Sequence, residues 1–173
     1  MDLKGTLNFG LKYSDGSPEL VGYSDSDWAG DIDTRRSTSG YVFQIGNGTI
    51  SWSSKKQATV AKSSTEAEYV ALSMAAQEAI WLNQLMGDLG QNMDRPITIF
   101  EDNQGAMELA KNPKYHNRTK HIDICHHFVR ERVMSNDIKV IYCSTKDNIA
   151  DMTKALPKSS FEYLRNLLGV FVV

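Results

Sequence analysis

The chain of 173 residues has little of several features that mark particular classes of protein. Its two cysteines, Cys125 and Cys143, form neither a Cys-x-x-Cys pair nor a Cys/His finger spacing, so we expect a reduced, intracellular chain without a structural zinc site. No run of about 18 apolar residues occurs, which argues against a membrane-spanning helix. Residues 1–4 lack the apolar core of a signal peptide. The net charge of −2 argues against a polycationic nucleic-acid coat but is compatible with a local basic patch.

The composition and the order of apolar patterns indicate one α/β domain. Hydrophobic residues make up 41% and charged residues 23%, as in ordinary globular proteins. Gly46-Asn47-Gly48 separates two β-rich runs and predicts a hairpin. The expected strands cover 20–25, 41–45, 49–53, 96–101 and 138–142, and the expected helices cover 63–89, 103–111, 120–134, 147–156 and 161–168. This order predicts a mixed five-stranded sheet with helices packed on it.

The longest expected helix, 63–89, distinguishes two glutamates by their position on the helical wheel. At about 100° per residue, Glu68 lies within about 40° of the apolar stripe, whereas Glu66 is about 160° away from Glu68 on a more polar side. A carboxylate on a core-facing stripe is costly unless it is paired or binds a cation. The alternative is that Glu68 lies at the rim of the core and only complements the helix dipole. The stripe consists of Leu72, Ala75, Ala79, Leu82 and Met86.

Three aspartates also occupy positions that suit a site. Asp25 and Asp102 each stand where an expected strand ends, and ligands of open α/β sheets collect at the carboxyl ends of strands. Each could instead be a turn or helix-capping residue. Asp151 lies in the expected helix 147–156, where it could also be a plain surface residue. Asp27 would point the same way as Asp25 on a continuing strand and is a reserve candidate.

Several acids on one edge of a sheet would repel one another without cations, so the pattern suggests a metal site. Ligation by oxygen atoms alone favours Mg²⁺ or Mn²⁺ over zinc. Two such ions about 3.5–4 Å apart are the usual apparatus for cleaving a phosphodiester bond.

The motifs around these acids resemble the ribonuclease H domain of copia-type LTR retrotransposon Pol polyproteins. The match covers about residues 20–157 in order. It includes Tyr23-Ser24-Asp25, Arg35-Arg36-Ser37-Thr38-Ser39-Gly40-Tyr41, Ala67-Glu68-Tyr69-Val70-Ala71-Leu72, Asp102-Asn103-Gln104, Arg118-Thr119-Lys120-His121 and Asn148-Ile149-Ala150-Asp151. The resemblance implies a ribonuclease H-like fold and two Mg²⁺ ions, replaceable by Mn²⁺, held by Asp25, Glu68, Asp102 and Asp151.

One departure from the family pattern concerns a histidine. Many ribonucleases H carry one on a flexible loop about ten residues before the fourth acid, and the corresponding stretch here, 142–147, has none. Proton transfer to the leaving group would then occur otherwise, or the reaction would be slower.

The residues that could contact a substrate fall into three groups. Asn103, Gln104 and Trp28 stand beside the candidate ligands, although the first two could simply cap a helix. A basic cluster includes Lys111, Lys114, His116, Arg118, Lys120 and His121, with Arg130 and Arg132 further on, and is either a phosphate-binding surface or a solvated face. A weaker one consists of Arg35, Arg36, Lys55 and Lys56. We expect Trp52 and Trp81 in the core.

The resemblance implies an enzyme that hydrolyses the RNA strand of RNA/DNA hybrids during reverse transcription. It implies residues 1–19 as the link from a reverse transcriptase domain, 20–157 as the ribonuclease H domain and 158–173 as a C-terminal helix and tail. Reverse transcriptase and the hybrid would be the partners, in a cytoplasmic virus-like particle or the nucleus. Two alternatives stay open: an integrase- or transposase-like nuclease, and a catalytically weak module that only binds hybrid.

Overall fold

The computed structural model describes residues 6–13, 19–91, 96–111 and 120–172. The strands are β1 (Phe9–Leu11), β2 (Leu20–Ser26), β3 (Thr38–Ile45), β4 (Gly48–Lys56), β5 (Ile97–Glu101), β6 (Ile138–Tyr142) and β7 (Val170–Val172). The helices are α1 (Ser64–Asp88), α2 (Gln104–Lys111), α3 (Lys120–Met134) and α4 (Lys158–Leu167), with short 3₁₀ helices η2 (Thr145–Asp147) and η3 (Ile149–Thr153).

The main sheet has five strands in the order β4-β3-β2-β5-β6. Strands β2, β3 and β4 pair antiparallel, whereas β5 runs parallel to both β2 and β6. Gly46 and Asn47 have positive φ angles of 57° and 62° in the β3–β4 turn, as the hairpin pattern requires. The predicted mixed sheet is confirmed. Because β2 and β5 are parallel neighbours, their carboxyl ends open at the same edge of the sheet.

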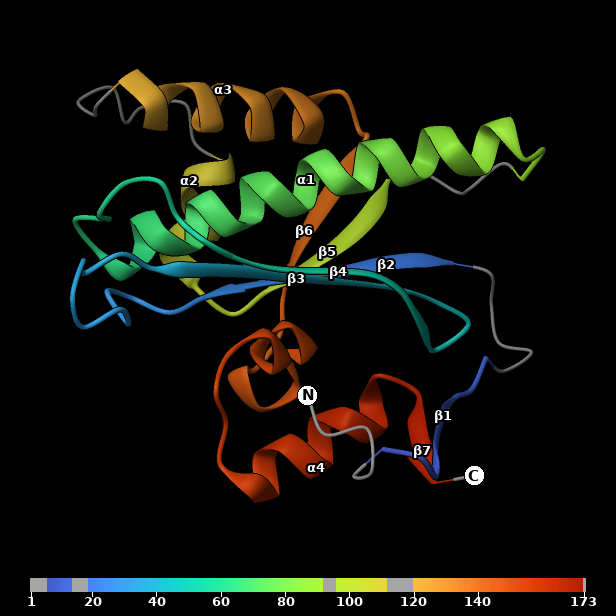
Figure 1. Ribbon diagram of the computed structural model, residues 1–173. Helices are drawn as coiled ribbons and strands as arrows, with labels where there is room; N and C mark the ends of the chain where they lie inside the picture. Colours follow the sequence, from blue (N-terminus) through green and yellow to red (C-terminus); the bar gives the residue numbers. More distant parts are fainter. Residues whose placement is uncertain (1–5, 14–18, 92–95, 112–119, 173) are drawn as a thin grey trace.

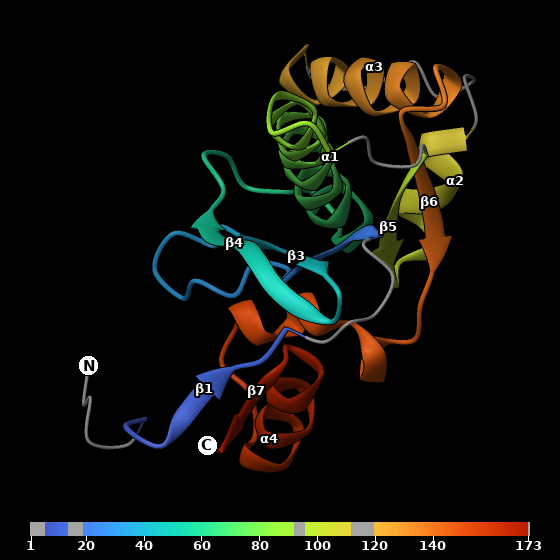
Figure 2. The same ribbon diagram turned by 90° about the vertical axis from the view of Figure 1, so that its right-hand side faces the viewer.

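Helices α1, α2 and α3 cover one face of this sheet (Figures 1 and 2). The side chain of Ser63 caps α1 by accepting a hydrogen bond from the backbone N–H of Glu66 at 3.2 Å. The apolar stripe of α1 is buried from Leu72 to Leu82 in one cluster with Phe43, Ile97 and Ile99, whereas Met86 at its end is only partly buried. This layer therefore contains the larger of the two hydrophobic cores.

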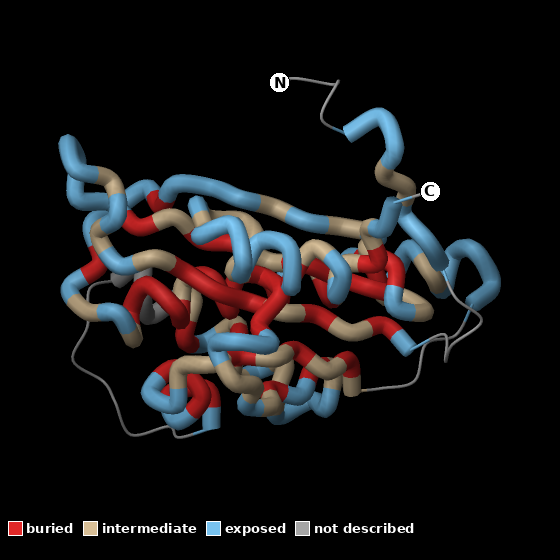
Figure 3. The backbone as a smooth tube through the Cα atoms, turned by 90° about the horizontal axis from the view of Figure 1, so that it is seen from below, coloured by how far each residue is buried: buried red, intermediate tan, exposed pale blue. Residues whose placement is uncertain are grey.

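The opposite face carries a smaller layer made of η3, α4 and the β1–β7 ribbon (Figure 1). Its core consists of Val42, Ile149 and Leu164. A Cβ atom at Gly40 would lie 1.8 Å from Oγ1 of Thr153, so only glycine lets η3 approach β3 this closely. Figure 3, a view from this side, shows buried segments through the middle of the molecule and exposed ones towards both termini.

Several expectations about local structure were wrong. Residues 147–156 do not form an α-helix: Asp147 ends the 3₁₀ helix η2, and Ile149–Thr153 form the 3₁₀ helix η3. Residues 1–19, where no strand was expected, contain β1, which pairs antiparallel with β7. Trp52 and Trp81 are not core residues, since they are 68% and 55% exposed. Large aromatic rings often remain partly exposed even on apolar surfaces, so their size alone did not determine burial.

The structure describes Cys125 and Cys143 as free thiols. Among the described residues, no helix combines the length and apolarity needed to cross a bilayer.

Candidate active site

Asp25 lies near the carboxyl end of β2 and is 3% exposed. It pairs across the ladder with Gly40 of β3. Burial is the main cause that raises the pKa of its carboxyl group, to about 7; Lys154 lowers the pKa, and nearby Asp151 and Asp102 raise it. A buried carboxylate among other acids is the environment in which a bound cation brings most stabilisation.

Glu68 enters the same region from the first turns of α1 and is 8% exposed. Its Oε2 atom is buried and has no hydrogen-bond partner among the described residues. Burial, followed by the charges of Glu101 and Asp25, raises the pKa of Glu68 to about 10. Glu66 is also buried, contrary to its expected polar side, but the structure groups Glu68, and not Glu66, with Asp25 and Asp102.

Asp102 directly follows β5 and completes a group of three carboxylates. One oxygen each of Asp25, Glu68 and Asp102 lies within 4.8 Å of the other two. This spacing and the unpartnered oxygen of Glu68 fit a divalent cation with oxygen ligands. The group draws on β2, α1 and the end of β5, which are far apart in the sequence.

Asp151 reaches the site from η3, and its position depends on Asn148. The Nδ2 atom of the fully buried Asn148 donates to the backbone carbonyl of Ser24 at 2.9 Å, and its Oδ1 accepts from the N–H of Ala150 at 3.2 Å. These bonds attach η3 to β2 one residue before Asp25. Asp151 is only half-buried and is not among the three clustered acids.

Lys154 is a charged residue of this site that the sequence did not suggest. Its ammonium group forms an ion pair with Oδ2 of Asp25 and another, at 2.9 Å, with Oδ1 of Asp151. It also donates to the carbonyl of Ser26 at 3.3 Å. The two aspartates raise the pKa of Lys154 although burial lowers it, so the group is cationic.

Glu101 is a second charged residue that the sequence did not suggest, because it is the last residue of an otherwise apolar strand. It is fully buried; its Oε2 accepts from the hydroxyl of Ser24 at 2.7 Å and its Oε1 from the N–H of Asn103 at 3.1 Å. Burial raises its pKa to about 8, although these hydrogen bonds lower it. Glu101 thus lies behind the site, where it connects β2 to the segment after β5.

Asp27 is not part of the acid group. Strand β2 ends at Ser26, so the alternation expected to align Asp27 with Asp25 stops before it. The Oδ1 atom of Asp27 accepts hydrogen bonds from the N–H groups of Thr38 at 2.7 Å and Gly30 at 3.4 Å. This carboxylate orders the loop between β2 and β3.

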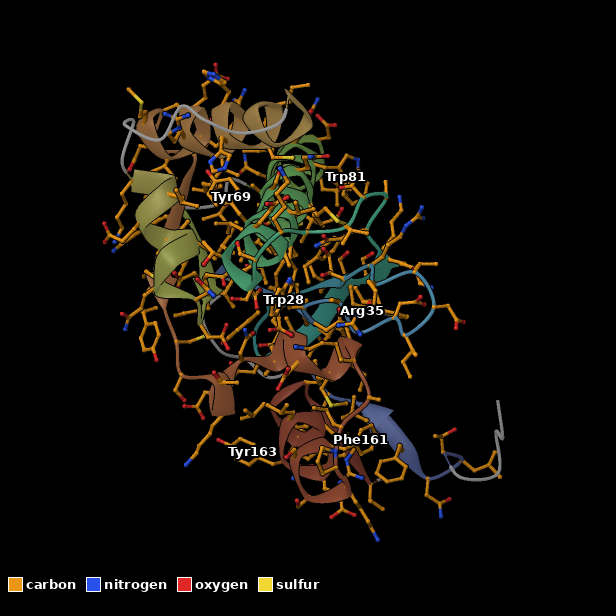
Figure 4. All side chains as sticks on the ribbon, turned by 90° about the vertical axis from the view of Figure 1, so that its left-hand side faces the viewer. Trp28, Arg35, Tyr69, Trp81, Phe161 and Tyr163 are labelled. Atoms are coloured by element: carbon orange, nitrogen blue, oxygen red, sulfur yellow. The ribbon has the colours of Figure 1, made fainter. Side chains whose placement is uncertain are left out.

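The predicted substrate-contacting residues have different surroundings. Trp28 is 57% exposed, its Nε1 donates to the carbonyl of Ala61 at 3.2 Å, and Figure 4 shows it between the N-terminal end of α1 and the η3 segment. The Oδ1 atom of Asn103 accepts from the N–H of Ala106 at 2.9 Å, which is the capping role considered above. Gln104 is exposed at the start of α2.

The main basic cluster is only partly described. Arg118 lies outside the described residues, and Lys120 and His121 are described only as the backbone that begins α3. Further along α3, Arg132 pairs with Asp137 at 3.2 Å, and Nε of Arg130 donates to the carbonyl of His126. In the second basic group, Lys56 pairs with Asp31.

Residues 142–147, which lack a histidine, contain a cysteine instead. Cys143 lies there, and burial raises the pKa of its thiol to about 12, assisted by nearby Asp102 and Glu101. The ring of His126 stacks on that of Tyr69 at a centroid distance of 4.1 Å, in the interface between α3 and α1. Among the described residues, no histidine belongs to the acid group.

Comparison with solved structures defines the class of this fold. LC11-RNase H1, isolated from compost by a metagenomic approach, superposes with a TM-score of 0.58 at 16% identity, covering 79% of this chain and 92% of that one. The same enzyme in complex with an RNA/DNA hybrid gives 0.54, covering 75% and 88%. Prototype foamy virus protease-reverse transcriptase gives 0.51 at 13% identity, covering 94% of this chain and 22% of that one. The chain has the ribonuclease H fold.

Sequence relatives identify the particular group. The chain is 44% identical over 169 residues to the retrovirus-related Pol polyprotein from transposon TNT 1-94 of Nicotiana tabacum, covering 97% of the chain and 13% of the relative. It is 44% identical over 170 residues to that from transposon RE1 of Arabidopsis thaliana, covering 97% and 12%. No protein-family model matches.

The resemblance to copia-type retrotransposon Pol polyproteins is therefore confirmed. The chain matches one segment of them, with a ribonuclease H fold, and spans 12–13% of the length of these two relatives.

Proposed function

We propose that this chain is a ribonuclease H that hydrolyses the RNA strand of RNA/DNA hybrids with Mg²⁺, or with Mn²⁺ in its place. The observation that supports this most strongly is the group of three carboxylates from β2, α1 and the end of β5, with Asp151 alongside. Cations can relieve the repulsion within such a group, and two divalent cations would activate a water molecule and stabilise the leaving oxygen.

The residues of the chain have separate parts in this proposal. Asp25 is grouped with Glu68 and Asp102 and is also affected by the charge of Asp151, so it would contact both cation positions. Glu68 and Asp102 would complete the first position and Asp151 the second. Attack of water on phosphorus would break the bond to the ribose O3′, leaving a 5′-phosphate and a 3′-OH, with the proton for O3′ supplied by solvent because no histidine stands at the loop.

Binding of the hybrid would depend on residues around this group. Trp28 offers an exposed ring for stacking, and Gln104 an exposed amide for the 2′-OH or phosphate. The Nδ2 group of Asn103 would also donate to the 2′-OH or phosphate, since only its Oδ1 caps α2. Arg118, Lys120 and His121 would contact phosphates. One fold neighbour was solved with an RNA/DNA hybrid, which agrees with this substrate class.

The chain would act within a Pol polyprotein beside a reverse transcriptase domain. We propose residues 1–19 as the link to that domain, 20–157 as the ribonuclease H domain and 158–173 as a C-terminal extension. One fold neighbour is a foamy virus protease-reverse transcriptase, which agrees with a reverse transcriptase as neighbour but not with any particular boundary.

Cleavage of an end-labelled RNA/DNA hybrid tests the proposal. We expect Mg²⁺-dependent cutting of the RNA strand alone, abolished by EDTA and reduced at least about a hundredfold in Asp102→Asn. Asp88→Asn, at the exposed far end of α1, is the matched control and should cut normally.

Two other outcomes would replace the proposal. Cutting of double-stranded DNA would favour an integrase- or transposase-like nuclease. Tight hybrid binding without cutting, in Mg²⁺ and in Mn²⁺, would favour a binding module.

A further inference from the structure

The two cation positions proposed above differ in what the chain itself places there. At the first, Asp25, Glu68 and Asp102 bring their oxygens within 4.8 Å, and Oε2 of Glu68 is buried without a hydrogen-bond partner among the described residues. At the second, Asp25 and Asp151 are already bridged by the ammonium group of Lys154. The second position therefore contains a positive charge from the chain itself.

The fold determines the position of Lys154 independently of any ion. Lys154 directly follows η3, and its backbone N–H donates to the carbonyl of Asp151. The hydroxyl of Ser54 on β4 donates to the carbonyl of Thr153 at 2.8 Å, which fixes the preceding residue to the edge of the sheet. The Lys154 side chain is 20% exposed, so its charge is not a freely solvated surface charge.

The ammonium group has three oxygen neighbours among the described residues. A lysine ammonium has three N–H donors. Its three neighbours here are Oδ2 of Asp25, Oδ1 of Asp151 and the carbonyl of Ser26. A cation that enters between the two aspartates must displace this arrangement.

We propose that Lys154 acts as an internal counter-ion of the second position, so that divalent cations bind in a fixed order. The first ion binds to Asp25, Glu68 and Asp102. The second binds to Asp25 and Asp151 only by displacing the ammonium of Lys154, and its affinity is lowered by this competition. The inference rests on the proposed metal site and identifies Lys154 as a positioning residue for it.

Titration of the metal-free protein with Mn²⁺, with the free ion followed by electron paramagnetic resonance, tests the order. We expect two classes of site in the wild type, the weaker requiring displacement of Lys154. Lys154→Met should tighten the weaker class by about tenfold and change the tighter class much less. Lys154→Arg keeps the charge and should leave the weaker class weak. Lys158→Met removes an exposed lysine four residues further on and should change neither class.

The inference would be overturned if the Mn²⁺ affinity of the weaker class were unchanged or lower in Lys154→Met. A different result would count against the proposed function: Asp102→Asn would then bind as much Mn²⁺ as the wild type, or neither protein would bind it. The two failures are therefore distinguishable in one titration series.

A measurement on the wild type covers the case in which Lys154→Met does not fold. Heteronuclear NMR of lysine Nζ groups, assigned with Lys154→Arg, should show a Lys154 signal protected from exchange in EDTA. The signal should persist while the first Mg²⁺ class fills and disappear as the second fills. Loss of the signal with the first class, or no protected signal at all, would contradict the inference.

Discussion

The two faces of the sheet are stabilised to different extents. On one face, α1, α2 and α3 bury a continuous apolar cluster that includes Phe43, Tyr69 and Leu72. On the other, η3 and α4 share a small cluster whose fully buried members are Val42, Ile149 and Leu164. Glu68 belongs to the first layer, whereas Asp151 and Lys154 belong to the second.

The two layers therefore have different roles: the large one mainly stabilises the fold, and the small one completes the candidate site. The large layer accounts for most of the apolar burial and also places Glu68. The small layer contributes less apolar burial, but it brings the fourth acid and the lysine to Asp25 through Asn148 and Gly40. Disrupting the second layer should therefore impair the site more than the fold.

Leu72→Ala should have the largest effect on stability. Leu72 is fully buried on α1, so its truncation should lower the free energy of unfolding by about 3–5 kcal/mol. Urea unfolding followed by circular dichroism measures this change. A loss below about 1 kcal/mol would show that the α1 layer is not the main core.

Leu164→Ala should have a smaller effect on stability and a larger one on the site. Leu164 is 2% exposed but lies in the small cluster, so we expect a loss of about 2 kcal/mol. Hybrid cleavage should fall beyond what the folded fraction explains, because η3 loses its support. Cleavage that tracks only the folded fraction, as expected for Leu72→Ala, would remove the distinction between the layers.

The pH dependence of stability in EDTA should reveal the cost of burying the acid group. Burial raises the pKa of Asp25 to about 7, above the usual value near 4 of an unfolded aspartate, so the folded protein binds more protons between these values. Thermal stability in EDTA should therefore decrease as the pH rises from about 4 to about 7.

Two comparisons sharpen this prediction. Saturating Mg²⁺ should flatten the decrease, since the cation favours the ionised carboxylates. Glu68→Gln should raise stability in EDTA at pH 7 by about 1 kcal/mol or more, because it removes a buried acid whose pKa is raised. Stability in EDTA that rises with pH would contradict the account.

Trp28→Ala should have the smallest effect. The exposed ring contributes little to folding, so stability should change by less than about 1 kcal/mol. Loss of one stacking surface should weaken hybrid binding about fivefold, as measured by fluorescence anisotropy. Trp81→Ala is the matched control: Trp81 is 55% exposed and lies about 20 Å along α1 from Glu68. Equal effects of both variants would remove Trp28 from the proposed interface.

The regular elements of the large layer could be predicted from the sequence because their signals are local. The α1 stripe repeats over several turns, and the Asn-Gly turn has few alternatives. The pairing of β1 with β7 could not be predicted, since each strand has three residues and is stabilised only by the other at the far end of the chain. Segment 147–156 has no sustained period, and the 3₁₀ helix η3 within it depends on tertiary bonds such as that of Asn148 with Ser24.

The residues of the candidate site could likewise be predicted only where their signal is local in the sequence. Asp25, Glu68 and Asp102 could be selected because strand ends and a helical stripe are visible in the sequence. Lys154 and Glu101 could not, because their importance comes from burial beside residues far away in the chain. A lysine or a glutamate in sequence alone resembles any solvated charge.

The central claim is that Asp25, Glu68 and Asp102 bind one divalent cation together. A crystal soaked in Mn²⁺ and measured for anomalous scattering tests it most directly. We expect an anomalous peak at about 2.0–2.4 Å from an oxygen of each of the three carboxylates. A well-diffracting soaked crystal with Mn²⁺ bound elsewhere and no peak among these three side chains would contradict the account.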